Sequence, residues 1–162
     1  MENYNRAYTY RASGLHWSMP SEHLPDPEAP MYYAATGFLG EMGIFSTGVG
    51  TTRPFHYVLA PWIDPDALIS KLTVQNLPGV VFLPAQVRPY YGLFQQKRVP
   101  GIELVVTDPG SFDPVLTGVS ILQTLWVLYP DKIPLKNQTA AEGLDTLLGG
   151  PALRTAITEG KD

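Results

Sequence analysis

The sequence has 162 residues, a formal net charge of −4 and a pI near 5.3, so it lacks the basic footprint that a nucleic-acid binder needs. It contains no cysteine, which excludes disulfides, zinc ribbons and thiol catalysis. A hydrophobic fraction of 44% indicates a folded domain with a sizeable core, while no apolar run approaches the roughly 20 residues of a membrane span and the first residues do not resemble a signal peptide.

The N-terminal part is divided by prolines, which make up 16 of the 162 residues against a usual share of about 5%. Residues 4–11 predict a strand with its tyrosines on one face, and Ser13-Gly14 predicts a turn after it. Several aromatic side chains of this part are candidates for stacking on sugar rings, although most tyrosines are expected at the core or its edge. These candidates are Tyr4, Tyr8, Tyr10, Trp17, Tyr32 and Tyr33.

Three Asp-Pro pairs predict helix starts, because each places a capping carboxylate before a proline suited to the first helical turn. Asp26-Pro27 predicts a short helix towards Ala35, Asp64-Pro65 a helix to about Val74, and Asp113-Pro114 a helix to Tyr129. A last helix is predicted over residues 151–158. The inward stripe of the third helix is predicted from its periodicity as Val115, Val119, Leu122 and Trp126.

Strand candidates lie between these helices, at residues 55–60, 80–83, 86–90 and 102–107. Strands that alternate with helices indicate an α/β or α+β fold, with a mixed β-sheet flanked by helices and several strands covered on both faces. We find no repeat and no domain boundary, so residues 1–162 are predicted to form one domain.

The stretch 43–55 is the strongest candidate for a functional site, because it combines three glycines, four hydroxyl side chains and one arginine. Glycine permits close approach of a ligand, and hydroxyl and guanidinium groups donate to oxygen-rich ligands. Two phosphate-binding patterns fail here: Val49-Gly50 replaces the Lys-Ser/Thr of a P-loop, and Arg53 replaces the third glycine of a dinucleotide fingerprint. We therefore expect no nucleotide cofactor.

A structural interpretation of this stretch remains open beside the functional one. In it, Thr51 and Thr52 merely open the next strand and Arg53 pairs with a carboxylate. Glu41, shortly before the stretch, is a candidate for a fixed hydrogen bond or for pairing with Arg53 or Arg6. The three histidines lack the i, i+4 spacing of a helical metal site, so no metal is expected. The only basic cluster, Lys97-Arg98, is interpreted as solvated surface.

Residues 46–55, followed by residues 60–64, resemble a signature of the NamZ-type exo-β-N-acetylmuramidases, which are bacterial peptidoglycan glycosidases. The family signature is S-E-G-R-G-T-T-R-P-F followed by A-P-W-I-D. Further family motifs occur along the chain in the family's order, among them Ser13-Gly14-Leu15-His16-Trp17, Val106-Thr107-Asp108, Tyr129-Pro130-Asp131 and Ala152-Leu153-Arg154. The sequence departs from the family pattern at Thr47, which replaces a glutamate, at Val49, which replaces an arginine, and at Ile44, His23 and His56.

The resemblance implies the C-terminal domain of a glycoside hydrolase that acts on peptidoglycan fragments with N-acetylmuramic acid at the non-reducing end. Family members begin with a Rossmann-like domain that holds the principal catalytic groups, so we expect this chain to be inactive alone and to share its cleft with such a partner domain, in cis or in trans. For the full-length protein the resemblance suggests a secreted or periplasmic location. Catalytic residues are not assigned. The expected substrate-binding residues are Glu41, Ser46, Gly50, Thr51, Thr52 and Arg53.

Two other functions remain open at this stage. One is a non-catalytic carbohydrate- or partner-binding module derived from the family, suggested by the substitutions at Thr47, Val49 and His56. The other is a folded remnant in which the glycine-rich stretch only stabilises the domain.

Overall fold

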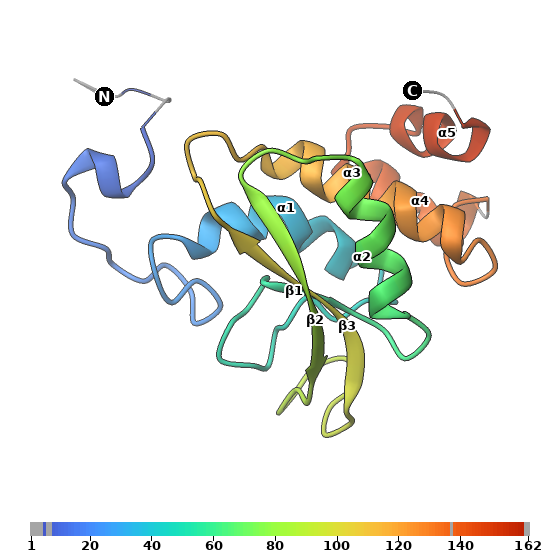
Figure 1. Cartoon of the computed structure of the whole chain (residues 1–162), viewed down its shortest axis with the longest axis horizontal. Coiled ribbons are helices and arrows are strands. Elements are labelled where there is room, and N and C mark those ends of the chain that lie inside the picture. Colours follow the sequence, from blue (N-terminus) through green and yellow to red (C-terminus); the bar gives the residue numbers. More distant parts are fainter. Residues whose placement is uncertain (1–4, 6–7, 137, 161–162) are drawn as a thin grey trace.

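A computed structural model describes residues 5, 8–136 and 138–160 of the chain (Figure 1). Three strands form one antiparallel sheet in the order β1-β3-β2, with Val58 opposite Ile102 and Leu83 opposite Glu103. The elements are η1 (Arg11–Ser13), α1 (Ala29–Glu41), β1 (Tyr57–Leu59), α2 (Pro65–Val74), β2 (Val80–Val87), β3 (Val99–Val106), α3 (Pro114–Leu128), α4 (Gln138–Leu147) and α5 (Ala152–Glu159). The predicted class, a single domain with helices flanking a sheet, is confirmed.

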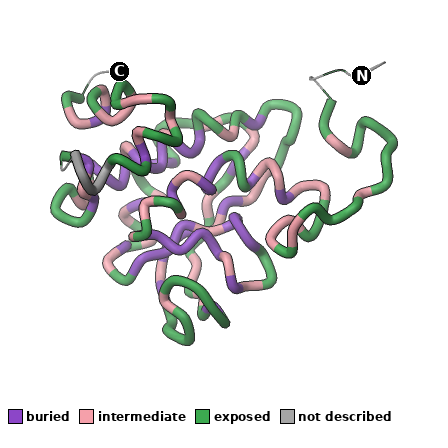
Figure 2. Tube along the Cα trace, turned by 180° about the vertical axis from the view of Figure 1, so that it is seen from behind, coloured by how far each residue is buried: buried purple, intermediate pink, exposed green. Residues whose placement is uncertain are grey.

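The core lies between one face of the sheet and the helices (Figure 2). Helix α2 packs on β2 and β3, whereas α1 packs on α3 and β1. Ile102 and Leu104 of β3 point to this side and are fully buried. On the other face of β2, Val81 is 44% and Leu83 47% exposed. The prediction that several strands are covered on both faces is therefore wrong for this edge strand.

Two of the three Asp-Pro pairs begin helices as predicted, whereas α1 begins at Ala29, two residues after Pro27, with Glu28 as its N-cap. The Asp64 carboxylate accepts hydrogen bonds from the backbone of Asp66 and Ala67, at 3.0 and 3.2 Å, and α2 spans the predicted residues. The Asp113 carboxylate likewise accepts from Leu116, at 2.9 Å, at the start of α3. Helix α1 runs to Glu41, further than predicted, and its extra turns bury Leu39.

The buried face of α3 differs from the predicted stripe. Val115 is 65% exposed, while Leu122 and Trp126 are buried as expected. The helix turns Gly118 towards α1, where an added Cβ would lie only 2.1 Å from the Ala35 carbonyl oxygen. The close contact between α1 and α3 thus decides which face of α3 is buried. Position 118 at this contact needs the smallest residue and not the most apolar one.

Three strand predictions need correction. The first strand begins at Tyr57 instead of Phe55, because Phe55 has φ of +68°, a left-handed conformation outside any strand. Residues 80–87 form one strand through Pro84, which is tolerated because β2 is an edge strand. Residues 8–11 form a turn and the start of a 3-10 helix, since no strand pairs with them; the predicted strand's other residues, Asn5 apart, lie outside the described part.

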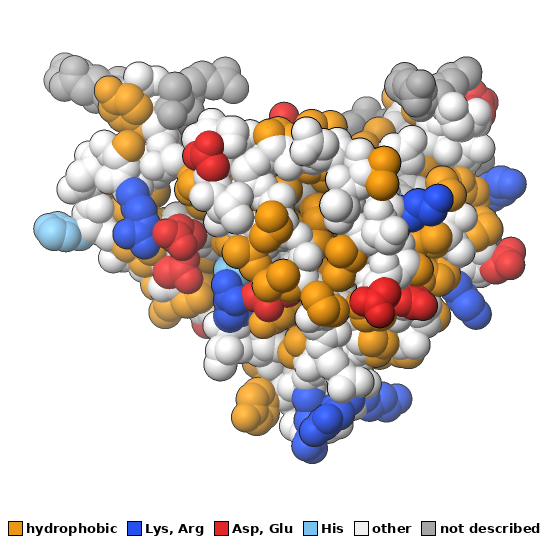
Figure 3. Space-filling model, in the orientation of Figure 1, with side chains coloured by type: hydrophobic (Ala, Val, Ile, Leu, Met, Phe, Trp, Pro, Cys, Tyr) orange, Lys and Arg blue, Asp and Glu red, His pale blue; other side chains and the backbone are white. Residues whose placement is uncertain are grey.

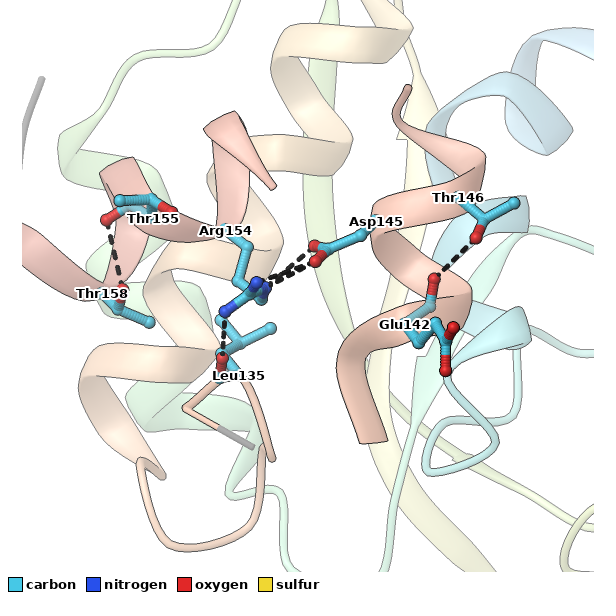
Figure 4. A network of polar contacts seen from close by, with 7 residues as sticks. All are labelled: Leu135, Glu142, Asp145, Thr146, Arg154, Thr155 and Thr158. Atoms are coloured by element: carbon cyan, nitrogen blue, oxygen red, sulfur yellow. Dashed lines mark hydrogen bonds and ion pairs between the residues drawn. The ribbon is translucent and has the colours of Figure 1, made fainter. Parts of the chain in front are cut away.

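Helix α4 was not predicted, and it is tied to α5 by one arginine (Figure 4). Arg154 donates from Nε and Nη2 to the Asp145 carboxylate, both at 2.8 Å, and from Nη1 to the Leu135 carbonyl oxygen at 3.2 Å. This bidentate pairing fixes the C-terminal helices against the end of the core. No helix within the described residues is long and apolar enough to cross a membrane.

Candidate functional site

A pocket of about 340 Å³ lies between α1 and the glycine-rich loop, which we define as residues 43–55. One residue of the β2–β3 connection and one from the N-terminal segment complete its wall. The lining residues are His23, Tyr33, Gly37, Gly40, Glu41, Phe45, Ser46, Thr47, Val49, Phe55 and Leu93.

Aromatic rings form one side of this pocket. The ring centroids of Tyr33 and Phe55 lie 4.8 Å apart at an interplanar angle of 64°. The Tyr33 ring lies over Gly37, where an added Cβ would approach it to 2.7 Å, and the side chain remains 51% exposed. A partly exposed ring with an apolar face and a polar hydroxyl suits the apolar face of a sugar. Of the aromatic candidates from the sequence, Tyr33 is the one in this pocket.

Glu41 is the only carboxylate among the described residues that line the pocket. It is the last residue of α1 and is exposed. No described cation pairs with it: Arg53, its predicted partner, pairs with Glu103 instead, and Arg6 lies outside the described residues. A carboxylate exposed at a pocket wall can accept hydrogen bonds from sugar hydroxyl or amide groups.

Ser46 lies at the back of the pocket and is 4% exposed. Its backbone forms two hydrogen bonds with Leu59, both 2.9 Å long, and its hydroxyl accepts from the Gly48 amide at 3.4 Å. The loop is therefore attached to β1 at this point, and the hydroxyl has a structural contact as well as a place in the pocket wall.

Two other predicted binding residues hold the loop in shape and do not line the pocket. The Gly50 carbonyl accepts a 2.7 Å hydrogen bond from the Tyr90 amide, and an added Cβ at Gly50 would lie 2.2 Å from the Tyr91 carbonyl oxygen. The Thr51 hydroxyl donates to the Gly48 carbonyl at 2.6 Å and accepts from the Arg53 amide at 3.1 Å. These contacts fasten the loop to itself and to the β2–β3 connection.

Arg53 and Thr52 are exposed residues outside the pocket lining. The Arg53 guanidinium forms an ion pair with Glu103 of β3 through Nη1, with side chains 46% and 18% exposed. The structural interpretation is thus correct in pairing Arg53 with a carboxylate, but wrong in placing Thr51 and Thr52 at the start of a strand, since β1 begins only at Tyr57. The structure brings Glu41 and Ser46 together at the pocket and places Gly50, Thr51, Thr52 and Arg53 beside it. Their part in binding a ligand stays a prediction.

His56 lies behind the loop and is 7% exposed. It stacks on Tyr32 with ring centroids 3.7 Å apart. Its Nδ1 lies 2.9 Å from the Pro54 carbonyl oxygen, which can only accept, so Nδ1 carries the proton. Burial lowers the pKa of His56 below its usual value near 6.5, which favours the neutral ring. This histidine supports the loop and does not line the pocket.

The sequence did not predict that residues from these separate segments line one pocket. The spacing of Tyr33, Gly37 and Gly40, at i, i+4 and i+7, is a signal for one helix face, but only if α1 is extended beyond Ala35. Nothing in the sequence indicated that Leu93 would join them. No three histidine, aspartate or glutamate side chains of the described residues gather as a metal site would require.

Comparisons with known proteins agree with this architecture. The profile of the family described as "Exo-beta-N-acetylmuramidase NamZ, C-terminal" matches residues 31–162. The Peptidoglycan beta-N-acetylmuramidase NamZ of Bacillus subtilis (strain 168) is 33% identical over 160 residues, which are 99% of this chain and 38% of that protein. A crystal structure of a DUF1343 family protein from Bacteroides fragilis superposes with a TM-score of 0.86 and 28% identity, over 96% of this chain and 41% of the other. The chain thus spans about two fifths of the length of these relatives.

Proposed function

The chain belongs to the family of NamZ-type exo-β-N-acetylmuramidase C-terminal domains, and on this basis we propose that its pocket binds the terminal N-acetylmuramic acid of a peptidoglycan fragment. The domain would form the substrate-binding wall of a glycoside hydrolase. The departures at Thr47, Val49 and His56 suggested a non-catalytic module instead, but the relative from Bacillus subtilis is itself a muramidase, and no comparison favours that alternative.

The observation that carries the proposal is the pairing of an aromatic wall with one carboxylate in a single pocket. Tyr33, which packs against the buried Phe55, offers a surface for a sugar ring, and Glu41 offers an acceptor at the rim. Both features lie on the segments that carry the strongest family resemblance or directly precede them.

A complete hydrolytic site is not expected from this chain. Most glycosidases place two carboxylic acids on either side of the scissile bond, roughly 5 to 9.5 Å apart, and Glu41 stands alone among the described lining residues. The relatives are more than twice as long as the chain. We propose that the rest of the protein, a Rossmann-like domain in cis or in trans, supplies the second group and closes the cleft, so that the chain by itself binds sugar without turnover.

Calorimetric titration with the disaccharide of N-acetylmuramic acid and N-acetylglucosamine tests the pocket. Tyr33→Ala should weaken binding about tenfold, since an aromatic contact contributes roughly 0.5–1.5 kcal/mol beyond its buried area. Leu147→Ala is the control, because Leu147 is a large apolar residue that is similarly exposed, at 53%, and lies outside the pocket. Equal affinity of the Tyr33 variant and the wild type would contradict the proposal, provided that both unfold at the same temperature.

Release of terminal N-acetylmuramic acid tests the division of the active site. We expect no release by the isolated chain and measurable release when it is joined to the Rossmann-like half of a relative. In the joined protein, Glu41→Gln should lower kcat by about a hundredfold or more if Glu41 moves a proton in the reaction, while binding persists. Activity of the isolated chain would contradict the shared cleft, and inactivity of the joined protein would contradict the muramidase proposal.

A further inference from the structure

The connection between β2 and β3, residues 88–98, is a basic segment of this acidic chain, and we call it the hairpin tip. It holds Arg88, Lys97 and Arg98 and no acidic residue, although the whole chain has a net charge of −4. All three side chains are exposed. Figure 3 shows basic side chains gathered at the end of the molecule where this hairpin projects beyond the helices.

The hairpin register turns a two-residue cluster into a three-residue patch. Val87 and Val99 form the last residue pair between β2 and β3. Arg88 follows Val87 and Arg98 precedes Val99, so the two arginines lie at the same end of the sheet. Side chains at such neighbouring positions interact, and like charges there repel each other. The interpretation of Lys97-Arg98 as mere solvated surface did not include this third cation.

These cations lack the carboxylate partners that other arginines of the protein have. Arg11, Arg53 and Arg154 each form an ion pair with an acidic side chain. Arg88 instead donates to the Gln96 side-chain oxygen at 2.8 Å. Within the described residues, no acidic group pairs with any cation of the hairpin tip, so its charge is free to attract an anion from solution.

The hairpin tip has a defined conformation that carries strain. Phe94 and Gln96 have φ of +62° and +61°, left-handed conformations that are unfavourable for residues other than glycine. Backbone hydrogen bonds hold the tip, among them those from the Gln96 amide to the Pro89 carbonyl, at 2.8 Å, and from the Tyr90 amide to the Gly50 carbonyl. Strain of this kind gathers at ligand-binding loops, where the surrounding structure fixes it.

The hairpin tip also joins the pocket. Leu93 lines the pocket wall, and the Tyr91 hydroxyl lies 3.3 Å from Nδ1 of His23, another lining residue. Tyr90 and Tyr91 are 72% and 48% exposed, so aromatic surface continues from the pocket onto the tip. A ligand longer than one sugar can therefore occupy the pocket and reach the tip.

We propose that the hairpin tip binds the carboxylates of an acidic glycan strand whose terminal sugar occupies the pocket, an inference that rests on the proposed function. In a peptidoglycan glycan, each N-acetylmuramic acid carries a lactyl carboxylate, so a second acid follows one disaccharide after the first. Arginine grips a carboxylate through two parallel hydrogen bonds, and lysine adds a point charge. The pocket would select the sugar, and the tip would select an acidic strand over a neutral one.

The test compares two tetrasaccharides with the same β-1,4-linked backbone. One is a peptide-free peptidoglycan tetrasaccharide, and the other is chitotetraose, which has no carboxylate. Lys97→Ala/Arg98→Ala should weaken binding of the acidic tetrasaccharide about fivefold at low salt, the size expected from two exposed charge contacts. Its affinity for chitotetraose should not change. Because the screening length falls from about 10 Å at 0.1 M to about 3 Å at 1 M salt, the loss should diminish at high salt.

The matched control is Lys71→Ala/Lys132→Ala, which removes the same charge from exposed positions outside the hairpin tip and should bind both ligands as the wild type does. Wild-type affinity of the tip variant for the acidic tetrasaccharide overturns the inference. If Tyr33→Ala still weakens binding in that case, the proposed pocket stands and only the tip is rejected. A wild-type chain that binds neither tetrasaccharide rejects both proposals.

Discussion

Two arginine–carboxylate pairs in this molecule lie on family motifs and are built differently. Arg154 in α5 has three nitrogens engaged, by Asp145 and the Leu135 carbonyl, and the two side chains are 15% and 17% exposed. Arg53 on the glycine-rich loop pairs with Glu103 through one nitrogen and is 46% exposed. A guanidinium has five N–H donors. All three nitrogens of Arg154 are engaged in hydrogen bonds within the fold, whereas Arg53 retains donors that can bind a ligand.

The regions that surround these two ion pairs, the C-terminal helices and the glycine-rich loop, differ in the same way. The C-terminal helices are joined by contacts among themselves and to the end of the core. The glycine-rich loop and the hairpin tip contact each other through backbone atoms and leave aromatic and charged side chains exposed around a pocket. We infer that the C-terminal region serves stability and that the loop and tip serve binding.

Among substitutions that test this difference between the two regions, we expect the largest effect at Gly50. Gly50→Ala forces a Cβ to within 2.2 Å of the Tyr91 carbonyl oxygen, and we expect a loss of about 2–4 kcal/mol in the free energy of unfolding together with loss of sugar binding. Gly149→Ala is the control, since Gly149 also has positive φ, at +76°, but nothing lies within 4 Å of an added Cβ. Gly149→Ala should lower the free energy of unfolding by only about 1 kcal/mol. Equal losses in urea unfolding would show that backbone conformation, not contact with the hairpin tip, requires glycine.

Exchanging each arginine for alanine tests the contrast directly. Arg154→Ala should lower the melting temperature and leave sugar affinity unchanged, because it releases α5 from α4 without touching the pocket. Arg53→Ala should weaken binding of an acidic sugar up to about fivefold and should lower the melting temperature only slightly. Arg154→Lys keeps the charge but loses the bidentate contact, so it should resemble Arg154→Ala. Reversed effects on melting and binding would refute the assignment of roles.

His56 predicts a pH dependence that belongs to the loop region. Because burial lowers the pKa of His56 in the folded state, the unfolded chain takes up the proton first, at its ordinary pKa near 6.5. Stability should therefore fall as the pH decreases through and below that value. His56→Phe should show a shallower decrease between about pH 7.5 and 5 when the urea midpoint is followed against pH. Parallel curves for the variant and the wild type would contradict the neutral buried ring.

Asp145 predicts a smaller pH effect in the C-terminal region, confined to more acidic conditions. Hydrogen bonds from Arg154 hold the pKa of Asp145 below its usual value near 3.8. The stability that this pair contributes is fully present above about pH 4 and disappears as the pH falls through the lowered pKa. The difference in melting temperature between wild type and Asp145→Asn should therefore shrink below that pH. A constant difference down to pH 2.5 would mean that ionisation of Asp145 does not stabilise the fold.

Features that depend on neighbouring residues were predictable. The Asp64 and Asp113 carboxylates accept hydrogen bonds from amides two or three residues later, so the starts of α2 and α3 follow from short segments. The alternation of residues 102–106 likewise predicted which side of β3 faces the core. The ordered family motifs predicted the family, which the comparisons confirm.

The sequence by itself therefore determined the starts of α2 and α3, the class of fold and the family, because these depend on local hydrogen bonding and on residue order. Only the tertiary structure decided the binding surface. It placed Leu93 and Tyr33 in one pocket, paired Arg53 with a carboxylate 50 residues away, and through the pair Val87–Val99 brought Arg88 and Arg98 to the same end of the sheet. Such contacts arise from how helices and strands pack. A one-residue change in strand register or a rotation of one helix would alter them without changing any local pattern.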